Sequence, residues 1–454
     1  MNTSSSSPLD PPHTLTLEGL SACIHCGICL PACPTYQATG SEAESPRGRL
    51  YLMQKMLAGE LTAEAIEPHL DNCLACHGCE TVCPSGVQYG KLLIETREEL
   101  ARGDRSLSHR FKRFIFRWVL PNAALLRLGG HLLRVYQRSG LQHLIRASGL
   151  LKCIPNLTER EALMPTVPAH KMLQAGQVFG DPTGEPVVLP LGCVMDVFYN
   201  SVHWDTITVL TANGYRVHIP ESACCGALAH HAGDVDITRE LAVSMMEKLL
   251  KPNPSWIVMN SAGCGSSMKD YPHLLANDAA NVEVAQYFAE KVVDVTELLA
   301  KKPLVPFKRT LSNRIAYHAA CHLYHVQGVK TQPVALLEQV PGLTLVPLQN
   351  ADACCGSAGI YNIEHPELSA EILAAKMETI RAVCLPNPAE SGLTDMGLSN
   401  ALLFEKPVDT VVTGNPGCLL QLEKGVRDAG LPLQIRHPIS ILADAYRSND
   451  LQTL

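Results

Sequence analysis

Short apolar segments alternate with longer helix-compatible stretches from about residue 185 to the C-terminus. The segments cover residues 187–189, 216–219, 256–259 and 292–295 in the first half, and 314–317, 343–346, 410–413 and 433–435 in the second. An alternation of strand, loop and helix predicts an α/β layer fold. Because the same order occurs twice, we expect two repeated domains, over residues 185–305 and 306–454.

The first hundred residues show a helical pattern instead. Apolar residues recur with helical spacing at Leu50, Leu52, Met53, Met56 and Leu57,. We expect a small helical module over residues 21–100, in which this helix closes the core and a second helix begins near residue 89. Residues 1–20 are polar and rich in Ser and Pro, so they are expected to form a flexible tail.

Residues 101–184 are expected to form a basic helical linker. Its stretch from 105 to 152 holds ten Lys or Arg and no Asp or Glu, and Phe111, Phe114, Ile115 and Trp118 fall on one helical face,. Such a helix can lie on an anionic membrane surface or dock a partner subunit. It can also pack on its own protein with a solvated basic side, and this third interpretation is the commonest for such segments.

Composition narrows the class of protein. The chain has 454 residues, of which 46% are hydrophobic, and a net charge of −7, which argues against nucleic-acid binding,. No signal peptide and no apolar run of membrane-spanning length is present in the sequence,. The 18 cysteines occur in metal-like spacings, which indicates a reducing compartment,. We expect a cytoplasmic location, with peripheral contact to the inner membrane as a further option.

Eight cysteines near the N-terminus form two copies of the run C-x-x-C-x-x-C-x-x-x-C-P, which two-cluster ferredoxins use to hold iron–sulfur cubanes. Three cysteines of a run wrap one cluster, and the fourth ligates the other. The first 4Fe–4S cluster is therefore assigned to Cys23, Cys26, Cys29 and Cys83, and the second to Cys73, Cys76, Cys79 and Cys33. A structural zinc module is the alternative, but it would leave cysteines of each copy unused.

Eight more cysteines follow the predicted strands at matched points of the two repeats. They are Cys193, Cys224, Cys225 and Cys264 in the first repeat, and Cys321, Cys354, Cys355 and Cys418 in the second. Ligands of open α/β sheets bind beyond the carboxyl ends of the strands, so each set is expected to form a metal or cluster site.

Other candidate residues fit this pattern less well. Cys153 and Cys384 belong to neither set and are interpreted as structural. The histidines near the cysteine loops are interpreted as hydrogen-bonded polar residues or partners of the thiolates, with direct ligation less favoured; they are His230, His231, His318, His322 and His325. No G-x-G-x-x-G, no phosphate loop and no Ser/His/Asp arrangement is present in the sequence, so no catalytic residue is predicted,.

These motifs resemble those of the cysteine-rich-domain electron-transfer subunits, and most of all the iron–sulfur subunit of bacterial glycolate oxidase. The resemblance extends over residues 15–446 and includes the stretches 33–36, 46–49, 79–86, 261–265 and 354–359. It implies an N-terminal helical two-cluster ferredoxin-like module followed by two α/β cysteine-rich domains, in an α+β and α/β multidomain chain. It also implies two 4Fe–4S clusters on the N-terminal cysteines.

The resemblance further implies partners. FAD would lie on a partner subunit that oxidises glycolate to glyoxylate, accompanied by a related second subunit. Electrons would pass from the reduced flavin through this chain to a membrane quinone or another acceptor. An equivalent subunit of a lactate or glycerol-3-phosphate dehydrogenase is an alternative, and a zinc-binding structural module is another.

Two departures from the family pattern affect the expected cofactors. Related repeats often end in C-x-x-C, whereas here neither Cys264 nor Cys418 is followed by a second cysteine at that spacing. A further iron–sulfur cluster, a zinc ion and an empty thiol group therefore stay open for each C-terminal site. The second repeat also carries extra residues around 385–404, which are expected to form a surface insertion,.

Overall fold

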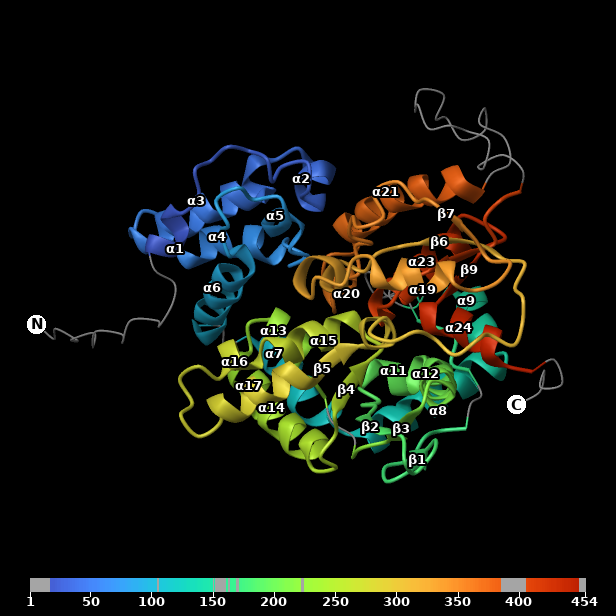
Figure 1. The fold of residues 1–454 in the computed structure, drawn as a ribbon. Coiled ribbons are helices and arrows are strands. Elements are labelled where there is room, and N and C mark those ends of the chain that lie inside the picture. Colours follow the sequence, from blue (N-terminus) through green and yellow to red (C-terminus); the bar gives the residue numbers. More distant parts are fainter. Residues whose placement is uncertain are drawn as a thin grey trace, which may run out of the picture.

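The computed structural model describes residues 17–448 except 104–105, 150, 152–160, 162–163, 169–170, 222–223 and 385–405. Figure 1 shows a helical N-terminal module beside two α/β layers, each built on its own sheet. This agrees with the fold class expected from the sequence. Cys153 and the predicted insertion at 385–404 lie outside the described residues.

The N-terminal module consists of α1 (Leu17–Ser21), α2 (Pro34–Thr39), η1 (Glu42–Glu44), α3 (Pro46–Leu57), α4 (Ala63–Asp71), α5 (Gly78–Thr81) and α6 (Tyr89–Gly103). Leu50 and Met53 of α3 are buried in its core, as the sequence predicts. Leu20 of α1 is fully buried in the same core. The end of the expected tail, from residue 17 to residue 20, is therefore helical and part of the module, because Leu20 has apolar side chains to pack against.

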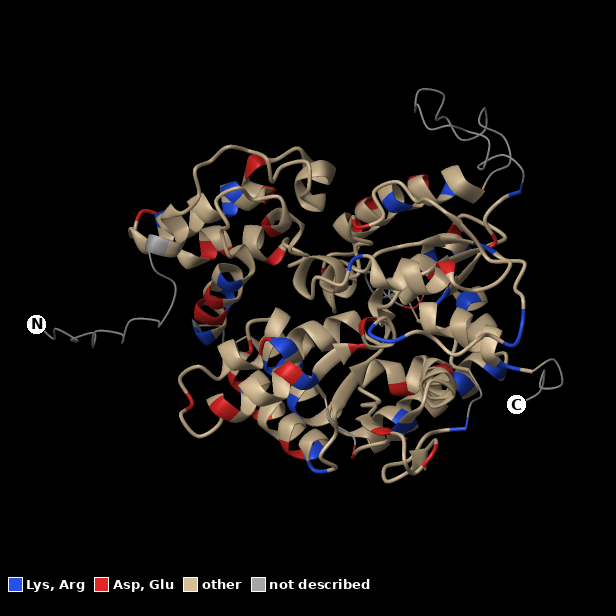
Figure 2. Ribbon diagram, viewed as in Figure 1, with Lys and Arg blue, Asp and Glu red and all other residues tan. Residues whose placement is uncertain are grey.

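The linker consists of α7 (Leu107–Phe114), η2 (Ile115–Val119), α8 (Ala123–Arg138) and α9 (Leu141–Ser148). Several of its basic residues pair with acidic residues of the rest of the protein. Arg127 pairs with Asp196 at 2.7 Å, Arg117 with Glu240 at 2.7 Å, and Arg113 with Asp234. Figure 2 shows basic and acidic positions interspersed over the helices of the molecule. The favoured interpretation, a helix packed on its own protein with a solvated basic side, agrees with this packing in part: Arg110 and Arg138 are exposed, whereas Arg113 and Arg127 pair with buried carboxylates.

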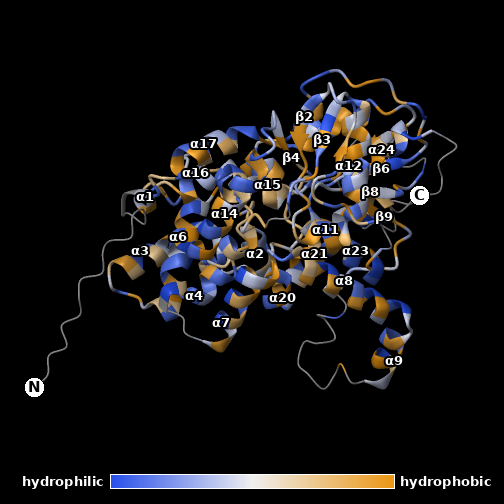
Figure 3. Cartoon of the chain, turned by 90° about the horizontal axis from the view of Figure 1, so that it is seen from below, coloured by the Kyte–Doolittle hydropathy of each residue, from blue (hydrophilic) through white to orange (hydrophobic). Residues whose placement is uncertain are grey.

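Large apolar side chains occupy the outer side of these helices. We call them the apolar stripe: Leu107, Phe111, Phe114, Trp118, Leu125, Leu128, Leu132, Val135, Leu141 and Leu144. In Figure 3, α7, α8 and α9 lie along one edge of the molecule. The ion pairs between basic residues and buried carboxylates fix which side faces in, and the apolar side is left outside.

The first repeat holds a sheet in the order β1-β3-β2-β4-β5. Its elements are β1 (Val178–Phe179), β2 (Glu185–Val188), α11 (Val194–Phe198), α12 (Asn200–Ala212), β3 (Tyr215–His218), α13 (Ala227–His231), α14 (Val235–Leu250), β4 (Trp256–Met259), α15 (Ala262–Lys269), α16 (Tyr271–Leu274), α17 (Val282–Lys291), β5 (Val292–Asp294) and α18 (Val295–Leu299). Only β1 is antiparallel among the described strands of this sheet, and it is an edge strand that the sequence analysis missed.

The second repeat holds a parallel sheet in the order β7-β6-β8-β9. Its elements are β6 (Arg314–Tyr317), η4 (His322–Val326), α19 (Gln332–Glu338), β7 (Thr344–Val346), α20 (Tyr361–Glu364), α21 (Pro366–Cys384), β8 (Thr410–Val412), α23 (Pro416–Asp428), β9 (Gln434–Arg436) and α24 (Pro438–Tyr446). Apolar side chains of both sheets belong to one core, which includes Val187, Ile315 and Ile439. The boundary between the repeats at residue 305 stays a prediction.

In both repeats the first parallel strand lies between the next two, so the strand order reverses there. β2 is flanked by β3 and β4, and β6 is flanked by β7 and β8. The crevice outside the carboxyl ends of such strands is where open α/β sheets bind ligands. The topology therefore brings the loops after three strands to one point in each repeat.

A buried ion pair holds the N-terminal module together. Arg49 of α3 is fully buried and pairs with Glu44 at 2.7 Å. It also donates hydrogen bonds to the carbonyl oxygen of His69 at 2.5 Å and to the hydroxyl of Thr35 at 3.1 Å. Arg49 thus connects α2, η1 and α4 around the chain segments that carry the cysteines.

We expect Arg49→Met to lower the free energy of unfolding by about 3 kcal/mol, because it removes the arginine from the buried carboxylate of Glu44 and leaves only His69, at 2.6 Å, beside it,. Urea unfolding followed by circular dichroism under anaerobic conditions measures this change. Arg102→Ala is the matched control, since Arg102 forms ion pairs on the surface, and it should change stability little. Equal stability of both variants would contradict this role of Arg49.

Candidate metal centres

Four thiols from both N-terminal runs line one small cavity in the helical module. Cys73, Cys76 and Cys79 come from the second run, and Cys33 comes from the first. Arg49, His77 and Tyr89 also line this cavity. Burial raises the pKa of the Cys79 thiol, and the charges of the other thiols, including Cys33, raise it further. The structure thus brings together the four cysteines that the sequence assigns to the second cluster.

The two triad loops have matching backbone conformations. His25 and Ala75, each just before the second cysteine of its triad, have φ angles of 54° and 48°. Gly27 and His77, each just after that cysteine, have φ angles of 84° and 60°. Non-glycine residues seldom adopt such angles, and they cluster at functional sites where the surroundings hold them. The two loops therefore have the same backbone shape around their cysteines, and each could bind a group of the same size.

Hydrogen bonds reach the thiols of the second triad and of Cys33. The hydroxyl of Tyr89 donates to Sγ of Cys73 at 3.4 Å, and the backbone N–H of Ala75 lies 3.5 Å from the same sulfur. Sγ of Cys33 lies 3.2 Å from the hydroxyl of Thr35. Donors to ligand sulfurs raise the reduction potential of a cluster because they stabilise its more negative, reduced form.

The thiols of the other predicted site lie nearer the surface. Cys23, Cys29 and Cys83 are partly buried and pack against the core of the module, and Cys26 is exposed. Burial raises the pKa of Cys29, and the charge of Cys23 adds to this effect. Ile24 and Ile28 of the same loop are 68% and 52% exposed. The loop of the first run therefore forms an apolar surface around one thiol.

In the first repeat, the four predicted thiols meet at the carboxyl ends of β2, β3 and β4. A hydrogen bond between Cys193 and Cys224 raises the pKa of Cys193 and lowers that of Cys224. A hydrogen bond between Cys225 and Cys264 lowers the pKa of Cys264. Three of the four are fully or almost fully buried, and Cys264 is partly exposed.

The second repeat gathers its thiols in the same way. Thiol–thiol hydrogen bonds connect Cys321 with Cys354, Cys354 with Cys355, and Cys355 with Cys418. Burial lowers the pKa of nearby Lys376 to about 8, and the charges of Cys355 and Cys354 act in the opposite direction. The amino group of Lys376 is thus placed where it can balance negative charge on the thiol group.

A histidine joins this second group. The two Sγ atoms of Cys355 and Cys418 and a ring nitrogen of His318 lie within 4.8 Å of one another. His322 fits the expected role of a thiolate partner, with its Nδ1 3.5 Å from Sγ of Cys321. His325 is hydrogen-bonded to Thr81 at 2.8 Å, and His231 packs edge-on against His322 with centroids 5.2 Å apart.

The second cluster cavity lies against the second repeat. Burial raises the pKa of Cys76, and the charge of Cys321 raises it further. Cys76 and Cys321 both pack against a small core that contains Leu74 and Cys354. The chain folds so that thiols predicted for two different sites become neighbours.

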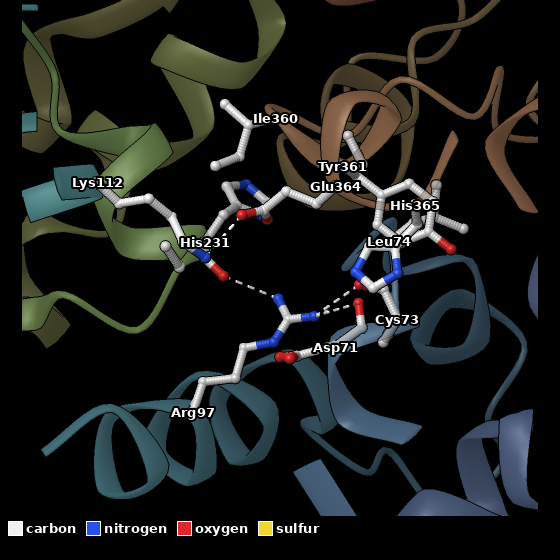
Figure 4. A pocket seen from close by; sticks show the side chains of 12 residues that line it. Asp71, Cys73, Leu74, Arg97, Lys112, His231, Ile360, Tyr361, Glu364 and His365 are labelled. Carbon is white, nitrogen blue, oxygen red and sulfur yellow. Dashed lines mark hydrogen bonds and ion pairs between the residues drawn. The ribbon is translucent and has the colours of Figure 1, made fainter. Parts of the chain in front are cut away.

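A polar cavity of about 250 Å³ lies on the other side of Cys73, where the module, α7 and both repeats meet (Figure 4). Arg97 of α6 donates hydrogen bonds to the carbonyl oxygens of Cys73 at 2.7 Å and of His231 at 2.9 Å. Lys112 pairs with Glu364 at 2.7 Å at its wall. Arg97 therefore ties the second triad to the first repeat.

Several of these residues could not be found from the sequence. Arg49, Arg97 and Lys376 act through tertiary contacts and have no spacing signal. Cys384 is buried in an apolar core, and burial raises its pKa to about 11. Its thiol stays protonated at neutral pH, which fits the structural role expected for it.

Three family models match the chain. A 4Fe–4S dicluster domain matches residues 19–87, the linker region of the glycolate oxidase iron–sulfur subunit matches 108–164, and a cysteine-rich domain matches 187–269 and 315–423. The probable glycolate oxidase iron–sulfur subunit of Bacillus subtilis is 35% identical over 93% of both chains. The chain belongs to the family of glycolate oxidase iron–sulfur subunits.

Further relatives agree with this membership. The glycolate oxidase iron–sulfur subunit of Escherichia coli is 31% identical over 94% of both chains. Lactate utilization protein A of Geobacillus thermodenitrificans is 28% identical, but over only 56% of this chain, so the lactate alternative fits loosely. As a member of the glycolate oxidase subunit family, the chain is an iron–sulfur electron-transfer subunit of an oxidoreductase complex. No described helix is both long and apolar enough to cross a bilayer.

We expect Tyr89→Phe to lower the reduction potential of one cluster and to leave the iron content unchanged, because it removes a hydrogen bond to Sγ of Cys73,. A potentiometric titration followed by electron paramagnetic resonance measures the shift. Tyr51→Phe is the control, since Tyr51 is half exposed on the outer side of α3. An unchanged potential in Tyr89→Phe would argue against a cluster on Cys73.

Proposed function

We propose that this chain carries single electrons from the reduced FAD of a partner subunit, which oxidises glycolate to glyoxylate, towards a quinone or another acceptor. A related second subunit completes the proposed complex. The observation that carries the proposal is the convergence of Cys33 with the triad of the other run around one cavity. Cysteine sites that lie next to one another in the folded protein suit stepwise electron transfer.

The residues present fit two 4Fe–4S clusters. Cys23, Cys26, Cys29 and Cys83 would hold the first, and Cys33, Cys73, Cys76 and Cys79 the second. When bound, each cluster accepts and releases one electron at a time, over a wide range of potentials. The protein supplies thiolates, hydrogen bonds to sulfur and a buried arginine nearby. The strained, matching triad loops support this assignment.

The C-terminal thiols would hold two further groups, either iron–sulfur or zinc. The set after β2, β3 and β4 comprises Cys193, Cys224, Cys225 and Cys264. The set after β6, β7 and β8 comprises Cys321, Cys354, Cys355 and Cys418. Their burial supports a structural or redox group, because several buried thiolates together need a cation to balance their charge.

The exposed loop of the first run is the proposed place where electrons enter. Cys26 is exposed there, and Ile24 and Ile28 present apolar surface around it. Exposed apolar residues that surround a redox ligand suit a docking partner, because the contact would bury them and bring the donor close. The second triad, by contrast, faces the second repeat.

We expect the substitution pair Ile24→Asp and Ile28→Asp to slow glycolate-dependent reduction of this chain by the flavoprotein at least tenfold, because charges replace the apolar contact. Stopped-flow absorbance of the clusters measures the rate. Val284→Asp, an exposed position on α17, is the matched control. If wild-type clusters are not reduced by glycolate and flavoprotein, the proposed function fails.

The apolar stripe supports a peripheral contact with the inner membrane. Its ten large apolar side chains are exposed on three helices that follow one another in the chain, and exposed apolar surface of this kind marks interaction sites,. Residues 107–148 contain no Asp or Glu, so nothing in this stretch repels anionic lipid,. Arg110, Arg134 and Arg138 form no ion pair with a described residue and can reach headgroups. Such a contact would place the complex where a lipid-soluble quinone is available.

We expect the full chain to sediment with vesicles that contain phosphatidylglycerol, and Phe111→Ser with Trp118→Ser to reduce the bound fraction several-fold. The cause is the loss of apolar area that enters the interface. Val284→Ser with Tyr287→Ser, exposed on α17, is the control. Unchanged vesicle binding, together with lost co-purification of the flavoprotein, would show instead that the stripe binds a partner subunit.

A further inference from the structure

His318 occupies an unusual position at the cysteine site of the second repeat. It follows β6 directly and is fully buried, three residues before Cys321. Its backbone N–H donates to the carbonyl oxygen of Val412 at 2.9 Å, which fixes it at the carboxyl end of β8. A ring nitrogen then lies within 4.8 Å of Sγ of both Cys355 and Cys418.

Neither ring nitrogen of His318 makes a hydrogen bond of normal geometry with a described residue, although the backbone of Ala351 interacts with the ring. A buried polar group without a partner destabilises the folded protein, and a neutral imidazole carries two such groups. His203, a fully buried histidine of the first repeat, shows the ordinary solution: its Nε2 lies 3.0 Å from the carbonyl oxygen of Leu191 and its Nδ1 lies 3.1 Å from Asn260. The ring nitrogens of His318 therefore lack the partners that hydrogen bonds supply to His203, and a bound metal ion would provide one.

The surrounding side chains leave this role to His318. Gln421, three residues after Cys418, stands where related repeats carry a further cysteine. Its amide is engaged elsewhere, with Asn362 at 3.0 Å and Ser369 at 2.9 Å. In the first repeat, the residue three before Cys193 is Pro190, which has no donor atom. The two repeats thus offer different ligand sets.

We propose that His318 is a nitrogen ligand to iron at the site of Cys321, Cys354, Cys355 and Cys418. This inference rests on the proposed function, because it assumes that the site carries iron–sulfur chemistry. A neutral imidazole brings less negative charge than a thiolate, and histidine ligation raises cluster potentials. The site of the second repeat then carries less negative charge, and accepts an electron more readily, than it would with a fifth thiolate in place of His318.

The His318 site lies next to the site of the second N-terminal triad. Cys76 of the second triad and Cys321 are neighbours. With a cluster at each site, one electron would pass between the site that includes Cys76 and the site that includes Cys321, so that one site would be oxidised by one electron and the other reduced by one electron. No bond is made or broken in this step.

The test compares three variants of the full chain, purified and reconstituted under anaerobic conditions. His318→Gln removes the nitrogen ligand, His318→Cys replaces it with a thiolate, and His203→Gln controls for the loss of any buried histidine. Iron and zinc are counted, and pulsed electron paramagnetic resonance of samples labelled with ¹⁵N-histidine detects nitrogen bound to iron.

We expect a histidine nitrogen coupling in the wild type and in His203→Gln, and its loss in His318→Gln. His318→Cys should retain iron, lack the coupling and show a lower reduction potential for one centre. A coupling that persists in His318→Gln, or zinc instead of iron at this site in the wild type, would overturn the proposal. Reduction of the wild-type N-terminal clusters by glycolate and flavoprotein is measured in the same preparations, so failure of the proposed function is recognised separately.

Discussion

The convergence of thiols from loops far apart in the chain is the constraint on which the rest of the structure depends. Cys33 reaches the triad of Cys73, Cys76 and Cys79, which lies some forty residues later in the sequence. The helices between them must therefore return the chain to its starting point. The buried pair of Arg49 and Glu44 stabilises this return, and the segments it joins carry the ligands. The core of the module is small, so a bound cluster adds the stability that apolar packing alone supplies poorly.

The two α/β repeats also bring distant cysteines together, but with different structural elements. There the strand order, not a pair of long loops, brings distant cysteines together at one crevice. The helical module then packs its second triad against the second repeat through Leu74, Cys354 and the hydrogen bond of Tyr361 to the carbonyl oxygen of Asn72 at 3.0 Å. The loops of the helical module and the crevice of the second sheet thus bring thiols of different sites next to one another.

Much of this could be predicted from sequence because cysteine spacing and strand periodicity are local signals. Each of the eight predicted strands overlaps a strand of the structure, and both C-terminal sets of thiols meet. The failures have physical reasons. β1 is two residues long and gains its partner only through β3. The linker sequence shows which face of α7 is apolar, but not that Asp196, Asp234 and Glu240 would pair with several of the linker's basic residues. The sequence places His318 among ordinary polar histidines, because the positions of its ring nitrogens relative to other polar groups are set only by folding.

The crossing of ligands between the two runs is tested most directly by iron counts on two double variants. Cys33→Ser with Cys73→Ser removes two ligands of one cluster if the runs exchange their fourth cysteines, whereas Cys33→Ser with Cys23→Ser removes one ligand from each cluster. We predict that the first pair loses about four irons and the second about eight, in anaerobic protein that retains its fold. The reverse order, with the greater loss in the first pair, would contradict the crossed arrangement.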